Sequence, residues 1–313
     1  SGKISGTEER QHMIETTVLL PFEDSGQFKE HLERYHVSYK QLALHRLTWE
    51  EKYLIAYVLF LPYDLWLIYK FLKNHRFDII HVSGGAWQWK GAVAGKVAGC
   101  KVLWHLNDTG MPGVVRAFFK LFVSRAADGF IVAAEKVRRY YLEMLNTGKN
   151  KPVFEIQAPV DCSFFNPDTV ETDVKISALD GINIVCVANI NPVKGLEYFL
   201  GMAGKLNKKY ADLNFWIVGP LYNSQKAYYR KLTGLAGKLG VENCFFYGPC
   251  SDVRKVLKSA DIYVCSSIAE ASPISVWEAM AMETPVVSAD VGDVSRFVRH
   301  GHNGYISKIR DED

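Results

Sequence analysis

Short apolar runs alternate with helical stretches along most of this chain, and this rhythm constrains its fold more than any other feature. In the second half, the strand-like runs are 182–187, 215–218, 244–247, 262–265 and 285–288. The helix-like stretches between them are 195–209, 225–239, 253–259 and 273–282. Strands that are apolar on both sides and joined through helices predict a parallel sheet with both faces covered.

The first half repeats the pattern, with predicted strands at 17–20, 77–82, 101–105, 130–133 and 153–156. The halves are separated by a turn-rich segment without periodicity, 158–168. Because 313 residues are enough for two separate cores, we predict an α/β chain of two Rossmann-like domains, 1–170 and 171–313, with parallel sheets facing a central cleft. Ligands of open α/β sheets bind at the carboxyl ends of the strands, so the functional site is expected there.

Composition excludes several classes of partner. The formal net charge is +3 and no compact run of lysines and arginines occurs, which argues against nucleic acid. The six cysteines show no C-x-x-C spacing, and three lie in apolar runs, as expected of free thiols in a reducing compartment without zinc. The N-terminal residues lack the apolar region of a signal peptide. We therefore expect a cytoplasmic protein.

Two stretches rich in apolar and aromatic residues bear on membrane contact. Residues 53–72 are about as long as a membrane span, but Asp64, Lys70 and the mid-run Pro62 argue against one. We predict two buried or half-buried helices broken at Pro62. Basic and aromatic residues also interleave in 114–125. For both stretches we expect packing in the protein, and the alternative is peripheral contact with a membrane surface.

A pair of carboxylates, Glu270 and Glu278, surrounds a predicted helix start. Ser272 and Pro273 are typical of an N-cap followed by proline at the first helical position. This places Glu270 in a loop and Glu278 in the helix, on either side of free backbone N–H groups that favour an anion. The alternative is a solvated loop carboxylate and an ordinary acidic helix former. The surrounding serines and the strand that follows favour a functional pair.

Three further candidates follow predicted strands. Lys194, before Gly195 at a helix start, can meet a phosphate as a point charge, or it is an ordinary surface lysine. His105, at the end of an apolar run, can donate to a hydroxyl or phosphate oxygen, or it is a packed core histidine. The paired glycines Gly84 and Gly85 permit close approach of the backbone to a ligand, or they only form a turn.

With these residues in place, the chain resembles the retaining GT-B glycosyltransferases of the group 1 type, which carry an E-x7-E motif. The resemblance covers nearly the whole chain and is strongest from 182 to 306. It rests there on Lys194-Gly195, on the stretch from Glu270 to Pro285, and on 301–306. In the first half it rests on 77–82, on the strand-ending His105, and on 160–167.

The resemblance implies roles for the candidate residues. Glu270 would hold hydroxyls of a donor sugar and Glu278 the ribose, while the backbone at Ser272, Pro273 and Ile274 would meet a diphosphate. Lys194 would neutralise the departing phosphate. His105 would lie near the reacting carbon, with Gly84 and Gly85 on the acceptor side. The family needs no metal or other cofactor, which agrees with the lack of a D-x-D-like cluster near the donor motifs.

The chain departs from the family pattern at three places. Asn189 stands in the donor site where the family usually has arginine. Without that charge, diphosphate binding loses a charge-assisted contact, roughly 1.5–3 kcal/mol. Glu283 stands where glycine commonly follows the E-x7-E helix, so that turn needs different backbone geometry. Both ends are shorter than the pattern, so we expect the family's first strand, with its glycine loop, and its terminal helices to lie outside this sequence.

The resulting hypothesis is a metal-independent retaining glycosyltransferase that moves a hexose from a nucleotide-diphosphate sugar to a glycan or lipid-linked acceptor. Domain 1–170 would bind the acceptor and domain 171–313 the donor. Two alternatives remain open. One is a catalytically weak nucleotide-sugar-binding or scaffold protein, suggested by Asn189 and the short ends. The other is a GT-B sugar-nucleotide epimerase, which works without an acceptor.

Overall fold

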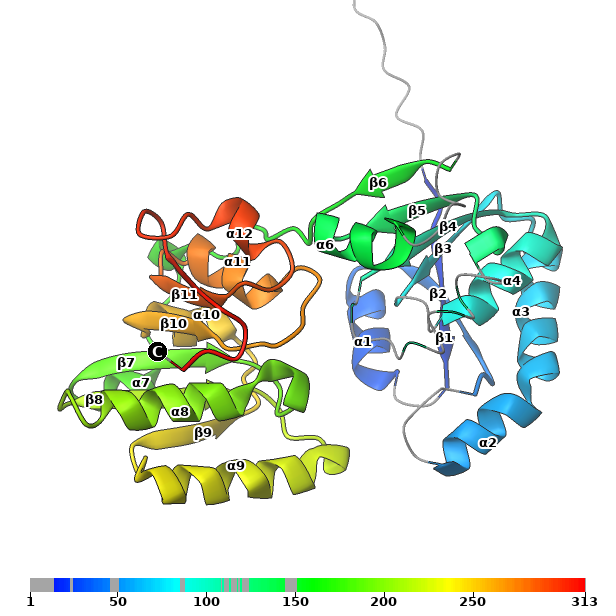
Figure 1. The fold of residues 1–313 in the computed structure, drawn as a ribbon. Helices are drawn as coiled ribbons and strands as arrows, with labels where there is room; N and C mark the ends of the chain where they lie inside the picture. The colour runs from blue at the N-terminus through cyan, green and yellow to red at the C-terminus, as the bar shows by residue number, and fades with distance from the viewer. Residues whose placement is uncertain are drawn as a thin grey trace, which may run out of the picture. The chain divides into compact units, whose positions relative to one another are not determined.

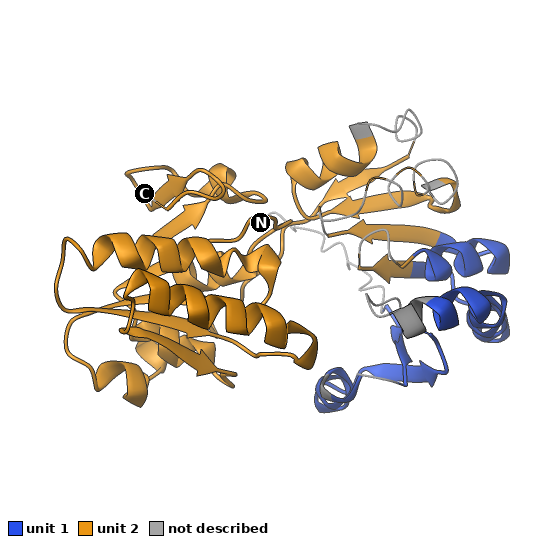
Figure 2. Ribbon diagram, turned by 60° about the horizontal axis from the view of Figure 1, so that its bottom comes forward, with its two compact units in different colours: residues 1–80, 89–101 blue, residues 81–88, 102–313 orange. Residues whose placement is uncertain are grey.

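The structure is a computed structural model that describes residues 14–22, 25–45, 51–84, 88–107, 124–143 and 151–312, with single positions 109, 113, 117 and 119 between them. Contacts divide the chain into two compact units, coloured separately in Figure 2. Unit 1 comprises residues 1–80 and 89–101, and unit 2 comprises 81–88 and 102–313. The predicted domains 1–170 and 171–313 follow the two sheets described below and remain a prediction.

In its described residues, unit 1 combines a parallel strand pair with four helices. Its elements are β1 (Thr17–Pro21), α1 (Gly26–Arg34), β2 (Ser38–Leu42), α2 (Glu51–Leu59), α3 (Leu61–His75) and α4 (Trp89–Ala98). Its apolar core joins α3 to α4 through Ile68, Leu72, Ala94 and Cys100. The sequence pattern misses β2, because Ser-Tyr-Lys-Gln-Leu is too polar to look like a strand.

The apolar stretch 53–72 forms two helices, as predicted. The break falls at Phe60, and Pro62 lies in the first turn of α3, where a missing N–H leaves no hydrogen bond unmade. Of the helices that the structure describes, none combines the length and the apolar character needed to cross a membrane. Most of 114–125 lies outside the described residues, but Phe119 is buried against Trp104 and Tyr141.

A buried polar cluster lies beneath α3. The Asp64 carboxylate is fully buried and meets Lys90 Nζ at 2.5 Å. It also accepts the backbone N–H of His45 at 3.0 Å and lies 2.9 Å from His45 Nδ1. Lys90 Nζ in turn donates to the His45 carbonyl at 3.0 Å and lies 3.5 Å from the centre of the Tyr57 ring. A buried carboxylate thus has a cation and two further polar partners, as burial of a charge requires.

A four-stranded parallel sheet has the order β3-β4-β5-β6. Its strands are β3 (Ile79–Ser83), β4 (Lys101–Leu106), β5 (Gly129–Val132) and β6 (Val153–Glu155). Strand β5 leads into the short helix α6 (Glu135–Arg138). All four strands match runs that the sequence predicts, within about two residues at each end.

The second sheet has six parallel strands in the order β12-β11-β10-β7-β8-β9 (Figure 1). The strands are β7 (Ile182–Val187), β8 (Leu213–Val218), β9 (Cys244–Gly248), β10 (Ile262–Cys265), β11 (Val286–Ala289) and β12 (Tyr305–Ser307). The helices between them are α8 (Leu196–Leu206), α9 (Lys226–Leu239), α10 (Val253–Lys258), α11 (Ile274–Ala281) and α12 (Val294–Phe297), and α7 (Val174–Ser177) precedes β7. The chain runs outward from β7 to β9 and then returns to β10, so β7 and β10 flank the topological switch point.

Alternate residues of the strands pack on opposite faces of this sheet. In β8, Phe215 and Ile217 join a core with α8 and α9, while Trp216 and Val218 join a core with α7 and α10. The predicted α/β fold, with parallel sheets in two Rossmann-like domains, is confirmed. The sequence pattern misses β12, which is only three residues long.

Candidate functional site

An open cavity of about 390 Å³ lies at the carboxyl ends of the strands of the six-stranded sheet. Its lining comes from the segments that follow β7, β8, β9 and β10 and from the start of α11. All seven residues predicted to bind a donor line it: Asn189, Lys194, Glu270, Ser272, Pro273, Ile274 and Glu278. Its volume is within the usual range for small-molecule sites. The topology therefore brings together residues up to 89 positions apart at the switch point.

Lys194 is held by a tight connection between β7 and α8. Residues Pro192–Lys194 form a 3₁₀ turn whose first N–H is capped by the Asn191 side chain. Gly195 follows with φ of +58°, and a Cβ at this position would lie 2.2 Å from the Ser266 carbonyl oxygen. Only glycine fits such a close approach. The Ser266 hydroxyl also donates to the Lys194 carbonyl at 3.0 Å, which fixes this loop against the segment after β10.

The Lys194 ammonium forms an ion pair with Glu270, with 2.6 Å between Nζ and Oε1. The Ser267 hydroxyl donates to the same carboxylate oxygen at 2.8 Å. Both charged side chains are mostly buried, at 28% and 18% exposed. Burial lowers the pKa of Lys194, but the adjacent Glu270 carboxylate outweighs this effect and raises the pKa above its ordinary value. The lysine is therefore a cation throughout the neutral range.

The start of α11 differs from the prediction in one respect. The helix begins at Ile274 with Pro273 in the N-cap position, so the expected Ser272 cap and first-turn proline are wrong by one residue. The Ser272 hydroxyl accepts from Trp277 Nε1 at 2.9 Å and donates to Asp293 at 3.2 Å instead of capping the helix. Without a side-chain cap, the first N–H groups of α11 remain available to a ligand at the cavity wall.

Glu278 lies one turn inside α11 and lines the same cavity. Among the described residues, this carboxylate has neither a hydrogen bond nor an ion pair, and burial raises its pKa. Glu283, just after the helix, adopts the left-handed region with φ of +58°. The sequence predicts unusual geometry at this turn, and the structure confirms it.

Asn189 lines the cavity beside Gly219. A Cβ on Gly219 would lie 2.2 Å from the Ala188 carbonyl oxygen, so the segments after β7 and β8 approach closely here. The charged residues of the lining are Lys194, Glu270 and Glu278, which is one cation against two carboxylates. An anionic ligand would thus depend on Lys194 and on the amide groups of α11.

An apolar wall was not predicted from the sequence. It comprises Val187, Val218, Pro220, Cys250 and Val253. The sequence indicates this wall only through position along the chain. Each of these residues ends a strand, closely follows one, or begins a helix at the edge of the sheet that holds the switch point. Such a wall suits the flat face of a ring better than a phosphate.

His105 and Gly84 belong to the other sheet. His105 Nε2 is buried without a hydrogen-bond partner among the described residues, and its ring stacks on His81 at 5.6 Å between centroids. Burial, and then the His81 ring, lower the pKa of His105, so it is neutral near pH 7. Gly84 follows β3 with φ of +122°, whereas Gly85 lies outside the described residues. A buried polar atom without a partner needs an explanation in a native structure, and a role toward a ligand is one such explanation.

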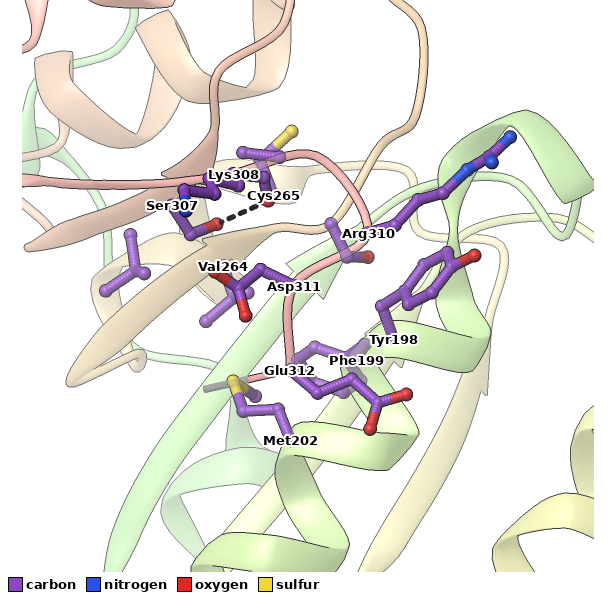
Figure 3. Close-up of a pocket in the computed structure, with 13 residues that line it drawn as sticks. Tyr198, Phe199, Met202, Val264, Cys265, Ser307, Lys308, Arg310, Asp311 and Glu312 are labelled. Atoms are coloured by element: carbon purple, nitrogen blue, oxygen red, sulfur yellow. Dashed lines mark hydrogen bonds between the residues drawn. The ribbon is translucent and has the colours of Figure 1, made fainter.

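A second cavity, of about 40 Å³, has room for roughly one water molecule. It lies where the residues after β12 cross α8, with Tyr198, Met202 and Glu312 among its lining (Figure 3). It contains none of the predicted site residues. Within the described ranges, no cluster of three or more His, Cys, Asp or Glu side chains could hold a metal ion.

Comparison with protein families agrees with this geometry. Residues 10–164 match the model "Glycosyltransferase Family 4", and residues 171–313 match "Glycosyl transferases group 1". Each of the two larger sheets therefore lies in a segment that matches a glycosyltransferase family model. The cavity lies within the group 1 domain, whereas His105 and Gly84 lie within the family 4 domain.

Relatives of these two domains carry glycosyltransferase names. An uncharacterised glycosyltransferase of Haemophilus influenzae is 27% identical over 75% of this chain and 64% of its own length. An Escherichia coli relative, UDP-Gal:alpha-D-GlcNAc-diphosphoundecaprenol alpha-1,3-galactosyltransferase, is 23% identical over 79% of this chain and 66% of its own length. Putative glycosyltransferase EpsD of Bacillus subtilis is 32% identical over 42% of this chain and 34% of its own length. The chain thus spans about two thirds or less of these relatives.

Solved structures share the fold. Anabaena Alr3699/HepE, crystallised with UDP and glucose, aligns with a TM-score of 0.77 at 19% identity, covering 94% of this chain and 78% of its own. A glycosyltransferase from Rickettsia africae aligns with a TM-score of 0.72 at 15% identity, covering 95% and 84%. These structural neighbours are GT-B glycosyltransferases, and the chain shares their fold.

In the group 1 domain, we expect Glu278→Gln to change how stability depends on pH. The native carboxyl group has a raised pKa, so its stabilising contribution is complete below the unfolded pKa, about 4.3, and is lost as pH rises through the native pKa. Glutamine does not titrate, so the variant does not lose stability in this way as pH rises. Urea unfolding at several pH values should therefore show the variant gaining stability over the parent between about pH 4 and pH 7. A difference that stays constant with pH would contradict the unpaired, buried carboxylate.

Proposed function

We propose that the chain is a retaining hexosyltransferase whose donor, a nucleotide-diphosphate sugar, binds in the switch-point cavity of the group 1 domain. The observation that carries the proposal is the convergence of Lys194, Glu270, Glu278 and the α11 start on one cavity. The relatives' names add support, since the Escherichia coli protein is named for a UDP-Gal donor and Alr3699/HepE was crystallised with UDP-glucose.

The lining suggests how the parts of the donor would be distributed. The apolar wall of Val187, Val218, Pro220, Cys250 and Val253 suits the base. Glu278, half-buried and unpaired, can accept hydrogen bonds from the ribose hydroxyls without first breaking a contact. The diphosphate would then lie against the α11 N–H groups and Lys194, and Glu270 would receive the sugar hydroxyls.

The ion pair between Lys194 and Glu270 positions both residues before a donor arrives. As the bond between the anomeric carbon and the phosphate oxygen breaks, negative charge grows on the leaving diphosphate. A fixed ammonium group stabilises that charge without reorganising. The acceptor hydroxyl forms the new bond on the face that the phosphate leaves, and its proton departs with the diphosphate. These steps need no metal or cofactor.

The acceptor side of the proposal involves the family 4 domain. His105, with its orphaned Nε2, and the glycines Gly84 and Gly85 are the proposed acceptor-side residues. A glycan or lipid-linked acceptor is proposed because the Escherichia coli relative is named for a diphosphoundecaprenol-linked sugar. Such an acceptor would place the protein at the cytoplasmic face of a membrane.

Turnover of candidate donors tests this function. The full chain is incubated with a panel of nucleotide-sugars, with and without lipid-linked or glycan acceptors, and released nucleoside diphosphate and sugar products are measured. We expect one donor to be consumed, with an acceptor-dependent product that keeps the donor's anomeric configuration. An inverted product would overturn the retaining assignment. Epimerised free nucleotide-sugar without acceptor would overturn transfer in favour of an epimerase.

A second candidate, a catalytically weak nucleotide-sugar-binding protein, is favoured by Asn189 alone. With asparagine there, the cavity lining has one cation against two carboxylates. Donor binding with no turnover by the parent chain, but measurable turnover by Asn189→Arg, would support this candidate over the enzyme.

A further inference from the structure

Helices α2 and α3 of unit 1 carry a cluster of large apolar side chains that the fold leaves in solvent. We call this cluster the α2–α3 apolar face. Its members are Ile55, Val58, Leu59, Phe60, Tyr63 and Trp66. Each is at least 47% exposed, and Leu59 reaches 70%. On α2, Ile55, Val58 and Leu59 recur at helical spacing and so share one side of the helix. Exposed apolar side chains that cluster in this way mark interaction sites, whereas single exposed residues do not.

The periodicity of the two helices separates this face from the core. In α3, Ile68 and Leu72 point into the core of unit 1, while Tyr63 and Trp66 lie on the opposite, exposed side. The rings of Tyr63 and Trp66 stack at 6.1 Å between centroids. The face therefore combines aliphatic side chains on α2 with a pair of amphipathic aromatic rings on α3, the residues enriched where a protein meets a membrane interface.

The exposed charges that flank the aromatic pair on α3 are basic, whereas α2 begins at an acidic residue, Glu51. Between residues 55 and 76 the sequence contains a single acidic residue, Asp64, and it is fully buried. On the exposed side of α3 the next charged residues are Lys70 and Lys73. Lys70 Nζ lies 4.8 Å from the centre of the Trp66 ring, so its ammonium stands at the margin of the aromatic pair. A lysine can lay its aliphatic stem along an apolar surface while its ammonium group reaches water or a headgroup, which suits the boundary between lipid tails and headgroups.

We propose that the α2–α3 apolar face docks on the surface of a bilayer that contains anionic lipids. The apolar side chains would enter the headgroup and acyl boundary, and Lys70 and Lys73 would meet the lipid phosphates. No helix crosses the bilayer in this arrangement, consistent with the two short helices of α2 and α3. The inference does not depend on sugar transfer, because vesicle binding is measured without donor or acceptor.

The charge pattern favours a lipid surface over a protein partner. A protein interface is typically surrounded by a mixed polar rim, whereas the described exposed charges that flank this face on α3 are basic. Basic residues near an anionic membrane surface each strengthen binding, and the effect decreases with ionic strength. A second copy of this chain would instead bring like charges together.

Cosedimentation of the full chain with vesicles tests the proposal. The vesicles contain phosphatidylcholine alone or phosphatidylcholine with phosphatidylglycerol. We expect binding to the mixed vesicles that weakens with added salt. Leu59→Ser combined with Trp66→Ser should weaken binding at least about tenfold, because both side chains lose their apolar contact with lipid. Lys70→Gln combined with Lys73→Gln should remove most of the preference for phosphatidylglycerol and most of the salt dependence.

A control is Val174→Ser, which changes an exposed apolar residue in unit 2. It should leave vesicle binding unchanged. All substituted side chains are exposed, so thermal melting should show that every variant folds like the parent. Three results would overturn the proposal: no vesicle binding by the parent, equal binding by the Leu59 and Trp66 variant, or parent self-association that this variant abolishes without any vesicle binding.

Discussion

Lys194→Met is expected to lower sugar transfer by about 100- to 1000-fold while the nucleotide-sugar still binds, because a fixed charge aimed at a developing anion is worth this much. The ammonium is mostly buried and paired at 2.6 Å with Glu270, so it is positioned before the reaction begins. Methionine keeps the length and apolar stem of lysine without its charge. Steady-state turnover of the donor identified by the nucleotide-sugar panel measures the effect.

Two controls separate catalysis from folding. Lys238→Met removes an exposed lysine in the last turn of α9 and should leave turnover unchanged. Lys194→Met also leaves Glu270 without its cation, so thermal melting should be compared with Lys194→Met combined with Glu270→Gln, which restores neutrality. Turnover within about threefold of the parent in the folded single variant, set against the expected range, would contradict the role given to Lys194.

Asp64→Ala is expected to lower the free energy of unfolding by about 3–5 kcal/mol, the usual effect of leaving a buried charge unpaired. The change removes the partner of Lys90, which is 7% exposed, together with the acceptor for two His45 nitrogens. Urea unfolding monitored by circular dichroism measures the loss. Lys29→Gln, in an exposed pair with Glu33 on α1, should cost less than about 1 kcal/mol.

The double variant Asp64→Leu with Lys90→Met distinguishes charge from packing. Replacing a buried pair by apolar side chains of similar size is often neutral or stabilising, so the double variant should recover most of the stability that Asp64→Ala loses. If it is as unstable as Asp64→Ala, the hydrogen bonds from His45, and not the ion pair, dominate this cluster.

The sequence predicted the fold and the composition of the cavity for the same physical reason. Strands apolar on both faces require helices on both sides, and parallel strands place their carboxyl ends at one edge. Lys194 follows β7 and Glu270 follows β10, so once the strands were assigned, these residues had to approach one another if the strands were neighbours. Their spacing in the sequence gives no hint of the ion pair itself.

Other features depend on tertiary contacts that no local pattern carries. Ser272 looks like a helix cap, but Trp277 and Asp293 compete successfully for its hydroxyl. Asp64 looks like a charge that interrupts an apolar stretch, yet Lys90 from a distant helix allows its complete burial. Because Asp64 faces the interior, Tyr63 and Trp66 on the opposite side of α3 face solvent. The hydropathy of the stretch could not distinguish this arrangement from packing inside the protein.

Calorimetric titration of uridine diphosphate into the full chain and into Glu278→Ala and Asn189→Arg tests the central claim most directly, because the claim is that this cavity holds a nucleotide diphosphate. We predict one site per chain in the parent. Glu278→Ala should bind at least about tenfold more weakly, and Asn189→Arg about tenfold or more tightly, because arginine adds a charge-assisted contact. Affinity that is the same in all three proteins would place the nucleotide elsewhere and contradict the account.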